Sequence, residues 1–213
     1  PTIGPKPGLG GDLAVRHALG IDTYDMYCGY SSSMIAIHSQ KLTQAFVDLF
    51  TSNELRRAMG AAGQKRAKLE YDWKTIIPRY EELWLSLAEL REKAKSKKTK
   101  ASNIWPARLD PTISFSHYPT SVLSVDTMLT LTYTTASDAI IKINQYKELS
   151  MVQYASLVFP TQKEIQNMLE AAEVSAGAPI RAESIIAVIT EPRRAFALRG
   201  LAWLTKLGVF HFS

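Results

Sequence analysis

Histidine and cysteine are the side chains of this 213-residue chain best suited to hold a metal or to act as a nucleophile. The four histidines, at positions 17, 38, 117 and 211, are scattered, and none lies three to five residues from another histidine or from Cys28, as metal-binding motifs require. Only His17 and His38 lie near Cys28 in sequence. We therefore interpret Cys28 as a packed small residue rather than a nucleophile. We therefore predict no metal site.

Two polar turns could support other chemistry. The glycines at positions 8, 10 and 11 precede Asp12, and backbone amides at such a helix start can bind phosphate. However, no strand is predicted before this turn, no Lys-Ser/Thr pair follows it, and Asp12 would repel a phosphate. We favour a structural turn, with a phosphate site as the alternative. The run Ser31–Ser33 lacks the glycine-bracketed elbow of a serine hydrolase, and we interpret it as a polar loop.

Basic residues are concentrated in the segment 91–100, which holds six of them and one acidic residue. The rest of the chain carries 19 basic and 19 acidic residues. The run could follow a phosphate backbone, but no aromatic residues are interleaved on which bases could stack. We interpret residues 93–102 as a basic linker between two domains, and we do not expect nucleic acid as a partner there.

The remaining composition bounds the class of protein. A single cysteine excludes an internal disulfide, and no apolar run approaches the roughly 20 residues of a transmembrane helix. We expect a soluble, cytoplasmic protein with no transmembrane segment. The chain starts at Pro1 in a loop rich in proline and glycine, so we also expect it to be a fragment of a longer protein.

The first half of the chain is predicted to be mainly helical after an irregular start. Residues 1–11 contain many prolines and glycines and are expected to lack regular structure. A short helix at 12–19, turns to residue 33 and a short strand at 34–37 should follow. Apolar residues at helical spacing then predict helices that begin near Ser39, near a Thr51–Glu54 capping box and at Trp73. The last should reach about Lys95, with a kink at Pro78.

The second half is predicted to be a mainly helical module, residues 103–213. Residues 103–120 are loop-like and 121–135 are extended, and helices are expected at 138–146, after a Thr161–Glu164 capping box, at 182–190 and at 193–207, before a strand at 209–212. This pattern predicts a winged-helix-like module. Its last helix carries Arg193, Arg194, Arg199 and Lys206 and could read DNA, but its wide apolar stripe favours packing.

One segment resembles a known family. Family-4, or group 1, glycosyltransferases of the two-domain GT-B type close with an acidic-Leu-Arg stretch, a Met-Gly-x-x-Gly step, a Trp that opens the last helix and a Tyr-Glu pair. In this chain the corresponding residues, in the same order, are Glu54-Leu55-Arg56, Met59-Gly60 with Gly63, Trp73 and Tyr80-Glu81. The resemblance covers residues 33–92. Residues 1–32 resemble a loop inserted in some members, and residues 100–213 resemble carboxy-terminal extensions of some bacterial members.

The resemblance implies a fold class and a function. Residues 1–92 would be an α/β remnant of a Rossmann-like GT-B carboxy-terminal domain, followed by the winged-helix-like module. Gly60 and Gly63 would permit close approach of their helix to a sheet, and Trp73 would anchor the last helix. The parent enzyme would transfer a sugar from a nucleotide-sugar donor to a glycan, lipid or small-molecule acceptor.

The same resemblance limits what this chain could do alone. The family's Glu-x7-Glu motif and basic donor-binding residue precede this region, and its acceptor site lies on the amino-terminal domain. No catalytic residue and no cofactor is therefore assigned here, the fragment is expected to be inactive, and its exposed last helix implies self-association or docking of the carboxy-terminal module. The alternative is a non-enzymatic interaction or nucleic-acid-binding winged-helix module, against which the neutrality outside the basic run argues.

Overall fold

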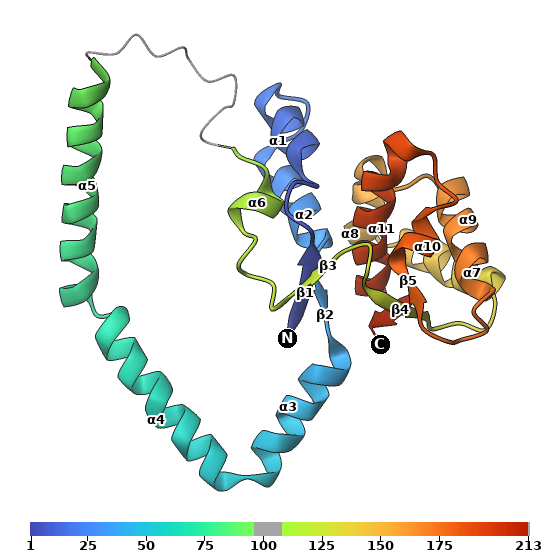
Figure 1. Ribbon diagram of the computed structural model, residues 1–213, viewed down its shortest axis with the longest axis horizontal. Helices are drawn as coiled ribbons and strands as arrows, with labels where there is room; N and C mark the ends of the chain where they lie inside the picture. Colours follow the sequence, from blue (N-terminus) through green and yellow to red (C-terminus); the bar gives the residue numbers. More distant parts are fainter. Residues whose placement is uncertain (96–107, 213) are drawn as a thin grey trace. The chain divides into compact units, whose positions relative to one another are not determined.

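The computed structural model of the chain describes residues 1–95 and 108–212. This described part is mostly helical, with two small sheets of three strands each (Figure 1). It forms two compact units. Unit 1 comprises residues 1–42 and 104–213, and unit 2 comprises residues 43–103.

The first sheet of unit 1 joins the start of the chain to its middle. Strand β1 (Thr2–Pro5) lies between β2 (Ala36–Ile37), to which it is antiparallel, and β3 (Ser121–Leu123), to which it is parallel. The expectation that residues 1–11 lack regular structure is therefore wrong. Pro1 and Pro5 lie at the two ends of the pairing, where a missing amide donor costs least, and Ile3 between them is buried.

Two helices follow β1. Helix α1 (Gly11–Ala18) is close to the predicted helix, whereas α2 (Tyr24–Ser33) replaces the predicted turns and the polar loop at Ser31–Ser33. The Thr23 side chain caps α2 by accepting a hydrogen bond from Met26 N. Helix α2 buries Tyr27 and Tyr30, so packing of these rings outweighs the low helix propensity of its serines and glycine.

The second sheet has β4 (Met128–Leu131) between β5 (Ile180–Arg181) and β6 (Phe210–Phe212), both antiparallel to it. The predicted extended segment 121–135 thus supplies two strands. The capping box of Thr161 and Glu164 is confirmed. The remaining short and long helices of unit 1 are α6 (Pro111–Ser114), α7 (Ala136–Lys147), α8 (Ser150–Gln153), η1 (Tyr154–Val158), α9 (Gln162–Glu173), α10 (Ala182–Ile186), η2 (Glu191–Arg193) and α11 (Arg194–Lys206).

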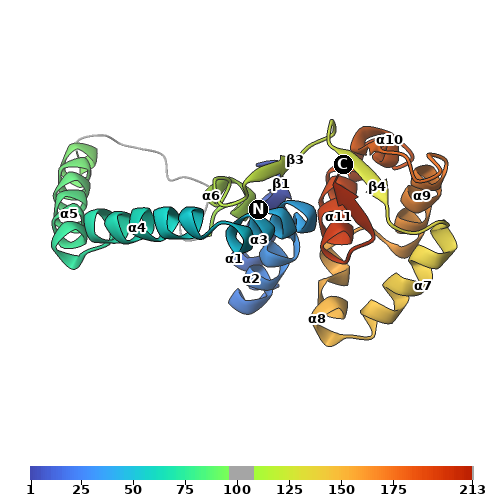
Figure 2. The same cartoon turned by 90° about the horizontal axis from the view of Figure 1, so that it is seen from below.

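Helix α11 lies at the centre of unit 1 (Figure 2). Every residue from Ala197 to Thr205 is buried, and the helix contacts β1, β2, β6, α2, α9 and α10. Trp203 stacks on Phe159 with ring centroids 5.0 Å apart. The buried Arg199 pairs with Asp12 at 2.7 Å, which ties this helix to α1.

These contacts correct the expected domain division. A boundary at the basic run places residues 1–92 apart from 103–213, but strand pairing and the Arg199–Asp12 ion pair join residues 1–42 to 104–213. Hydrophobic periodicity predicts where an element lies and not which distant strand it pairs with, which is why the boundary was misplaced. Of the expected linker at 93–102, residues 93–95 belong to a helix and the others lie outside the described residues.

Unit 2 contains the three helices predicted for this region. They are α3 (Ser39–Thr51, whose first residues belong to unit 1), α4 (Asn53–Glu70) and α5 (Trp73–Lys95). The cap of α4 is Ser52 rather than Thr51, since the Ser52 hydroxyl accepts from Leu55 N at 3.1 Å. Pro78 lies inside α5. None of these helices buries a residue.

Candidate functional site

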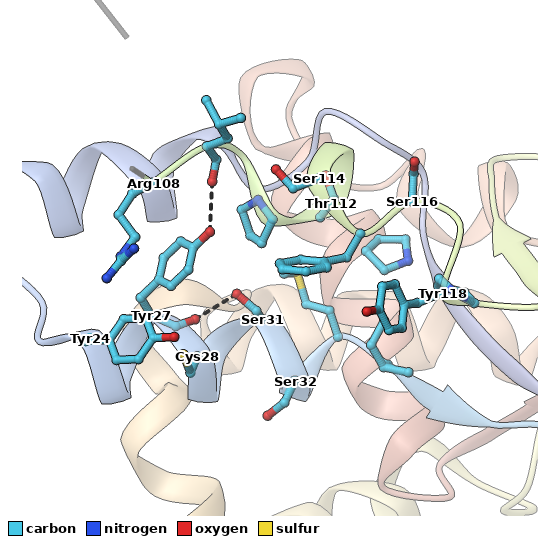
Figure 3. A pocket seen from close by; sticks show the side chains of 17 residues that line it. Tyr24, Tyr27, Cys28, Ser31, Ser32, Arg108, Thr112, Ser114, Ser116 and Tyr118 are labelled. Carbon is cyan, nitrogen blue, oxygen red and sulfur yellow. Dashed lines mark hydrogen bonds between the residues drawn. The ribbon is translucent and has the colours of Figure 1, made fainter. Parts of the chain in front are cut away.

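Unit 1 contains a pocket of about 530 Å³ between α2 and residues 108–119 (Figure 3). We call it the α2 pocket. Aromatic and aliphatic side chains and a few hydroxyl groups line it, and Arg108 is the one charged side chain among the described lining residues. The volume is within the range of small-molecule sites.

One wall of the pocket is the exposed side of α2. Helical spacing places Tyr24, Cys28 and Ser31 along this wall. The Tyr27 hydroxyl donates to Leu109 O at 2.8 Å, which joins α2 to the opposite wall, and the Ser31 hydroxyl donates to Tyr27 O at 2.7 Å. These hydroxyl groups are therefore committed to structural hydrogen bonds.

The opposite wall is held by the cap of α6. Asp110 accepts hydrogen bonds from Thr112 N at 2.8 Å and from Gly10 N at 3.2 Å, and Pro111 occupies the first helical turn. The Thr112 hydroxyl accepts from Gly8 N and Leu9 N at 2.9 and 3.0 Å. These bonds fix the residue 108–119 segment against the start of α1.

The same bonds decide the role of the glycine-rich turn. The amides that a phosphate would need are bound by Thr112 and Asp110, and Asp12 is paired with Arg199. The turn therefore has the structural role that we favoured, and the phosphate alternative is not supported.

The two ends of the pocket differ in charge. Arg108 lies at one end, with its guanidinium carbon 4.4 Å from the Tyr24 ring centroid (Figure 3). Tyr118 lies at the other end and meets Phe115 edge-on, with ring centroids 5.6 Å apart. A ligand in this pocket would therefore meet a guanidinium stacked on a tyrosine ring at one end and two further rings at the other.

The tyrosines on the α2 wall are neutral at physiological pH. The hydrogen bond between the side chains of Tyr24 and Cys28 raises the pKa of Tyr24, and burial raises the pKa of Tyr27. Cys28 is exposed and lines the pocket, so its interpretation as a packed residue is wrong. It has turned outward because α2 buries Tyr27 and Tyr30 on its other side.

Among the residues that the structure describes, the lining of the α2 pocket holds no histidine and no carboxylate, the side chains that most often act as general bases near neutral pH. Across the described ranges 1–95 and 108–212, no three His, Cys, Asp or Glu residues are grouped so that they could hold a metal ion. The pocket is large enough to enclose a small ligand, and its lining is mainly apolar.

A smaller pocket of about 350 Å³ brings together two of the four histidines, His38 and His211. The His38 ring contacts Phe212 with centroids 5.7 Å apart, and burial lowers the pKa of His38, which keeps its imidazole neutral near pH 7. The sequence did not predict that His38 and His211 line one pocket, because they are far apart along the chain. The two histidines lie in or beside strands of different sheets, and helix α11, which contacts both β2 and β6, brings those strands together.

The residues of the glycosyltransferase-like pattern lie on α4 and α5. Arg56 donates to Leu49 O and to Phe50 O, the latter at 3.0 Å, and so caps the end of α3. A side chain at Gly60 or Gly63 would meet no atom within 4 Å, and Trp73 is 72% exposed. The close packing that the resemblance implies at these residues is absent from the described structure.

Helix α11 does not present the basic face of a DNA-reading helix. Arg199 points inward to Asp12 and to carbonyl oxygens of Leu9 and Val158, and Arg193 pairs with Glu164 at 2.8 Å. The central residues of the helix are covered by other elements of unit 1. This geometry does not favour the nucleic-acid alternative.

No family model, curated protein or solved structure matches the chain. A search of the described helices finds none with the length and apolar character needed to cross a membrane.

Proposed function

We propose that this chain is the carboxy-terminal part of a nucleotide-sugar-dependent glycosyltransferase of the GT-B type. In the parent protein, α3–α5 would be the closing helices of the donor-binding domain, and a sugar would pass to a glycan, lipid or small-molecule acceptor. The main support is that the residues of the glycosyltransferase-like pattern lie on α4 and α5, two helices that bury none of their residues.

The exposed apolar side chains of α5 support the proposal, because they indicate a helix face that normally packs against another part of the protein. Trp73, Leu83, Trp84 and Leu87 recur at helical spacing on α5, as they would on a helix that packs against a sheet or domain. In the described structure these side chains are between 42% and 72% exposed. Exposed apolar surface of this kind is typical of an interface whose other side is missing.

The two glycines of α4 add a second argument. Glycine in a helix interior costs about 1 kcal/mol relative to alanine, so it is expected where a neighbour approaches closely. Gly60 and Gly63 have open space around them here. A closely packed Rossmann-like core in the parent would account for both residues.

The decisive experiment is to express the chain together with the protein segment encoded upstream of Pro1. We expect a Glu-x7-Glu motif and an amino-terminal Rossmann-like domain in that segment, and release of nucleoside diphosphate from a panel of UDP- and GDP-sugars when acceptors are supplied. The present chain alone should neither bind nor turn over these donors. Absence of such an upstream domain would refute the proposal, and micromolar binding by residues 1–213 in calorimetry would show that the donor site was misplaced.

A matched variant tests the packing argument independently of activity. In the present chain, Gly60→Ala should stabilise the protein by up to about 1 kcal/mol through helix propensity. In the extended protein the same methyl group should meet the packed core and destabilise it by about 1–3 kcal/mol. Urea unfolding of the four proteins measures both effects, and stabilisation in both backgrounds would contradict the proposed packing.

A further inference from the structure

Helix α4 exposes all of its residues, and its charges are mostly of one sign. It carries five basic and two acidic residues. Arg56 donates to carbonyl oxygens at the end of α3, and Glu70 accepts from Arg79 at 2.8 Å. The other four cations form no hydrogen bond or ion pair with any residue that the structure describes, and they are Arg57, Lys65, Arg66 and Lys68. The helix therefore presents unpaired positive charge.

The apolar residues of α4 lie on one side of the helix. They recur at helical spacing and are Leu55, Met59, Ala62 and Leu69. We call this surface the α4 stripe. Met59 and Leu69 are each more than half exposed. Arg66 lies on the same side with Lys65 next to it, and the long stems of these side chains can follow an apolar surface while their charged ends stay in a polar layer.

An exposed aromatic ring lies near each end of α4. Phe50 precedes the helix and is 80% exposed, and Tyr71 follows it and is 62% exposed. Between them α4 is one continuous helix of 18 residues, about 27 Å long at 1.5 Å per residue (Figure 1). Apolar residues, cations and terminal rings on one helix are typical of helices that lie in the plane of a membrane interface.

We propose that α4 binds the surface of a bilayer that contains anionic phospholipid. The α4 stripe would enter the boundary between headgroups and acyl chains, and the unpaired cations would contact the phosphates. A nucleic acid would pair with the cations but leave the apolar residues in water, whereas a lipid surface matches both. The inference does not depend on the proposed glycosyltransferase function, because the α4 stripe excludes Gly60, Gly63 and the apolar residues of α5.

Cosedimentation of the full chain with vesicles tests the proposal. We expect binding to vesicles of equal parts phosphatidylglycerol and phosphatidylcholine. Binding to pure phosphatidylcholine should be about tenfold weaker or less, because the cations then meet no net negative charge. Added salt should weaken the first interaction by screening. No binding to the anionic vesicles, or equal binding to both kinds, would overturn the proposal.

A matched pair of charge variants locates the binding on α4. Lys65→Gln combined with Arg66→Gln should lower the partition coefficient for anionic vesicles about tenfold. Lys6→Gln combined with Lys163→Gln removes the same charge at exposed positions of unit 1 and should leave the partition coefficient unchanged. An equal loss in both variants would show that net charge alone attracts the chain, and would overturn the assignment to α4.

A matched pair of apolar variants distinguishes a bilayer from an acidic polymer or protein. Met59→Gln combined with Leu69→Gln should also lower vesicle binding about tenfold, because less apolar surface enters the bilayer. Glutamine favours a helix, and circular dichroism checks that the helical content is kept. Trp84→Gln combined with Leu87→Gln, on α5, is the control and should bind as the unmodified chain does. Unchanged binding by the α4 variant would show that the cations act alone, and would overturn the lipid proposal.

Discussion

Substitution of individual residues in the core of unit 1 is expected to destabilise the fold. Arg199 is a clear case, because its guanidinium contacts Asp12, two carbonyl oxygens and the ring of Phe196, whose centroid lies 4.5 Å away. From the sequence it was a candidate for DNA contact. In the structure, removing it would leave the polar groups of Leu9, Asp12 and Val158 without this partner, which is the costly way to break a buried ion pair.

Gly200 gives a prediction at the same scale. A Cβ at this position would clash with Cγ and Cδ of Pro160, and a proline ring cannot move aside easily. Gly200→Ala should therefore destabilise the protein by about 1–3 kcal/mol, although alanine favours a helix. Urea unfolding followed by circular dichroism measures it. Gly63→Ala, with open space around it, is the control and should not destabilise, and an unchanged midpoint for Gly200→Ala would contradict the close contact.

Among the elements, α9 is fixed at its start by charge as well as by its cap. Two hydrogen bonds from Arg193, at 2.9 and 2.8 Å, and further bonds from Thr161 lower the pKa of Glu164 from its ordinary 4.5 to about 2. A lowered pKa means that the stabilisation is present above about pH 4.5 and is lost as the pH falls towards 2.

Arg193→Gln tests this pH dependence. The variant should be less stable than the unmodified chain by about 1–2 kcal/mol at pH 7, a value reduced from the full pKa shift because Arg193 is partly exposed. The difference should shrink as the pH falls from about 5 to 2, because protonated Glu164 no longer attracts the guanidinium. Denaturant titrations at several pH values measure it, with Lys163→Gln as a neighbouring control. Arg193 also lies over the Phe196 ring, with its guanidinium carbon 4.4 Å from the ring centroid. A difference that stayed constant with pH would show that Arg193 acts through this contact and not through Glu164.

At the scale of the molecule, the two units differ in how they bury apolar side chains. Unit 1 has a continuous core around α11, whereas the helices of unit 2 bury none of their residues. Helices without a packed face gain little stability from tertiary contacts. We therefore expect unit 2 to bind another protein surface through its exposed apolar side chains.

We predict concentration-dependent self-association through the apolar residues of α5. Trp84→Glu combined with Leu87→Lys should shift the chain towards monomer, because charges on this helix oppose burial of its apolar face. Sedimentation velocity over a range of concentrations measures the shift. Leu19→Glu, at an exposed position in unit 1, is the control and should associate as the unmodified chain does. A chain that remains monomeric at all concentrations would remove this prediction.

The sequence by itself determined the elements whose signals are local. The capping box of Thr161 and Glu164, the helix from Trp73 to Lys95 and the strand after Gly208 follow from spacing and caps within a few residues, and the structure has all of them. The tertiary structure alone decided the pairing of β1 with β3, the helical state of α2 and the α2 pocket. Thr2 bonds to Thr120 and Tyr27 bonds to Leu109, contacts between residues 118 and 82 positions apart. Local periodicity carries no information on such distant partners, because the energy that selects them comes from burial and hydrogen bonding across the assembled fold.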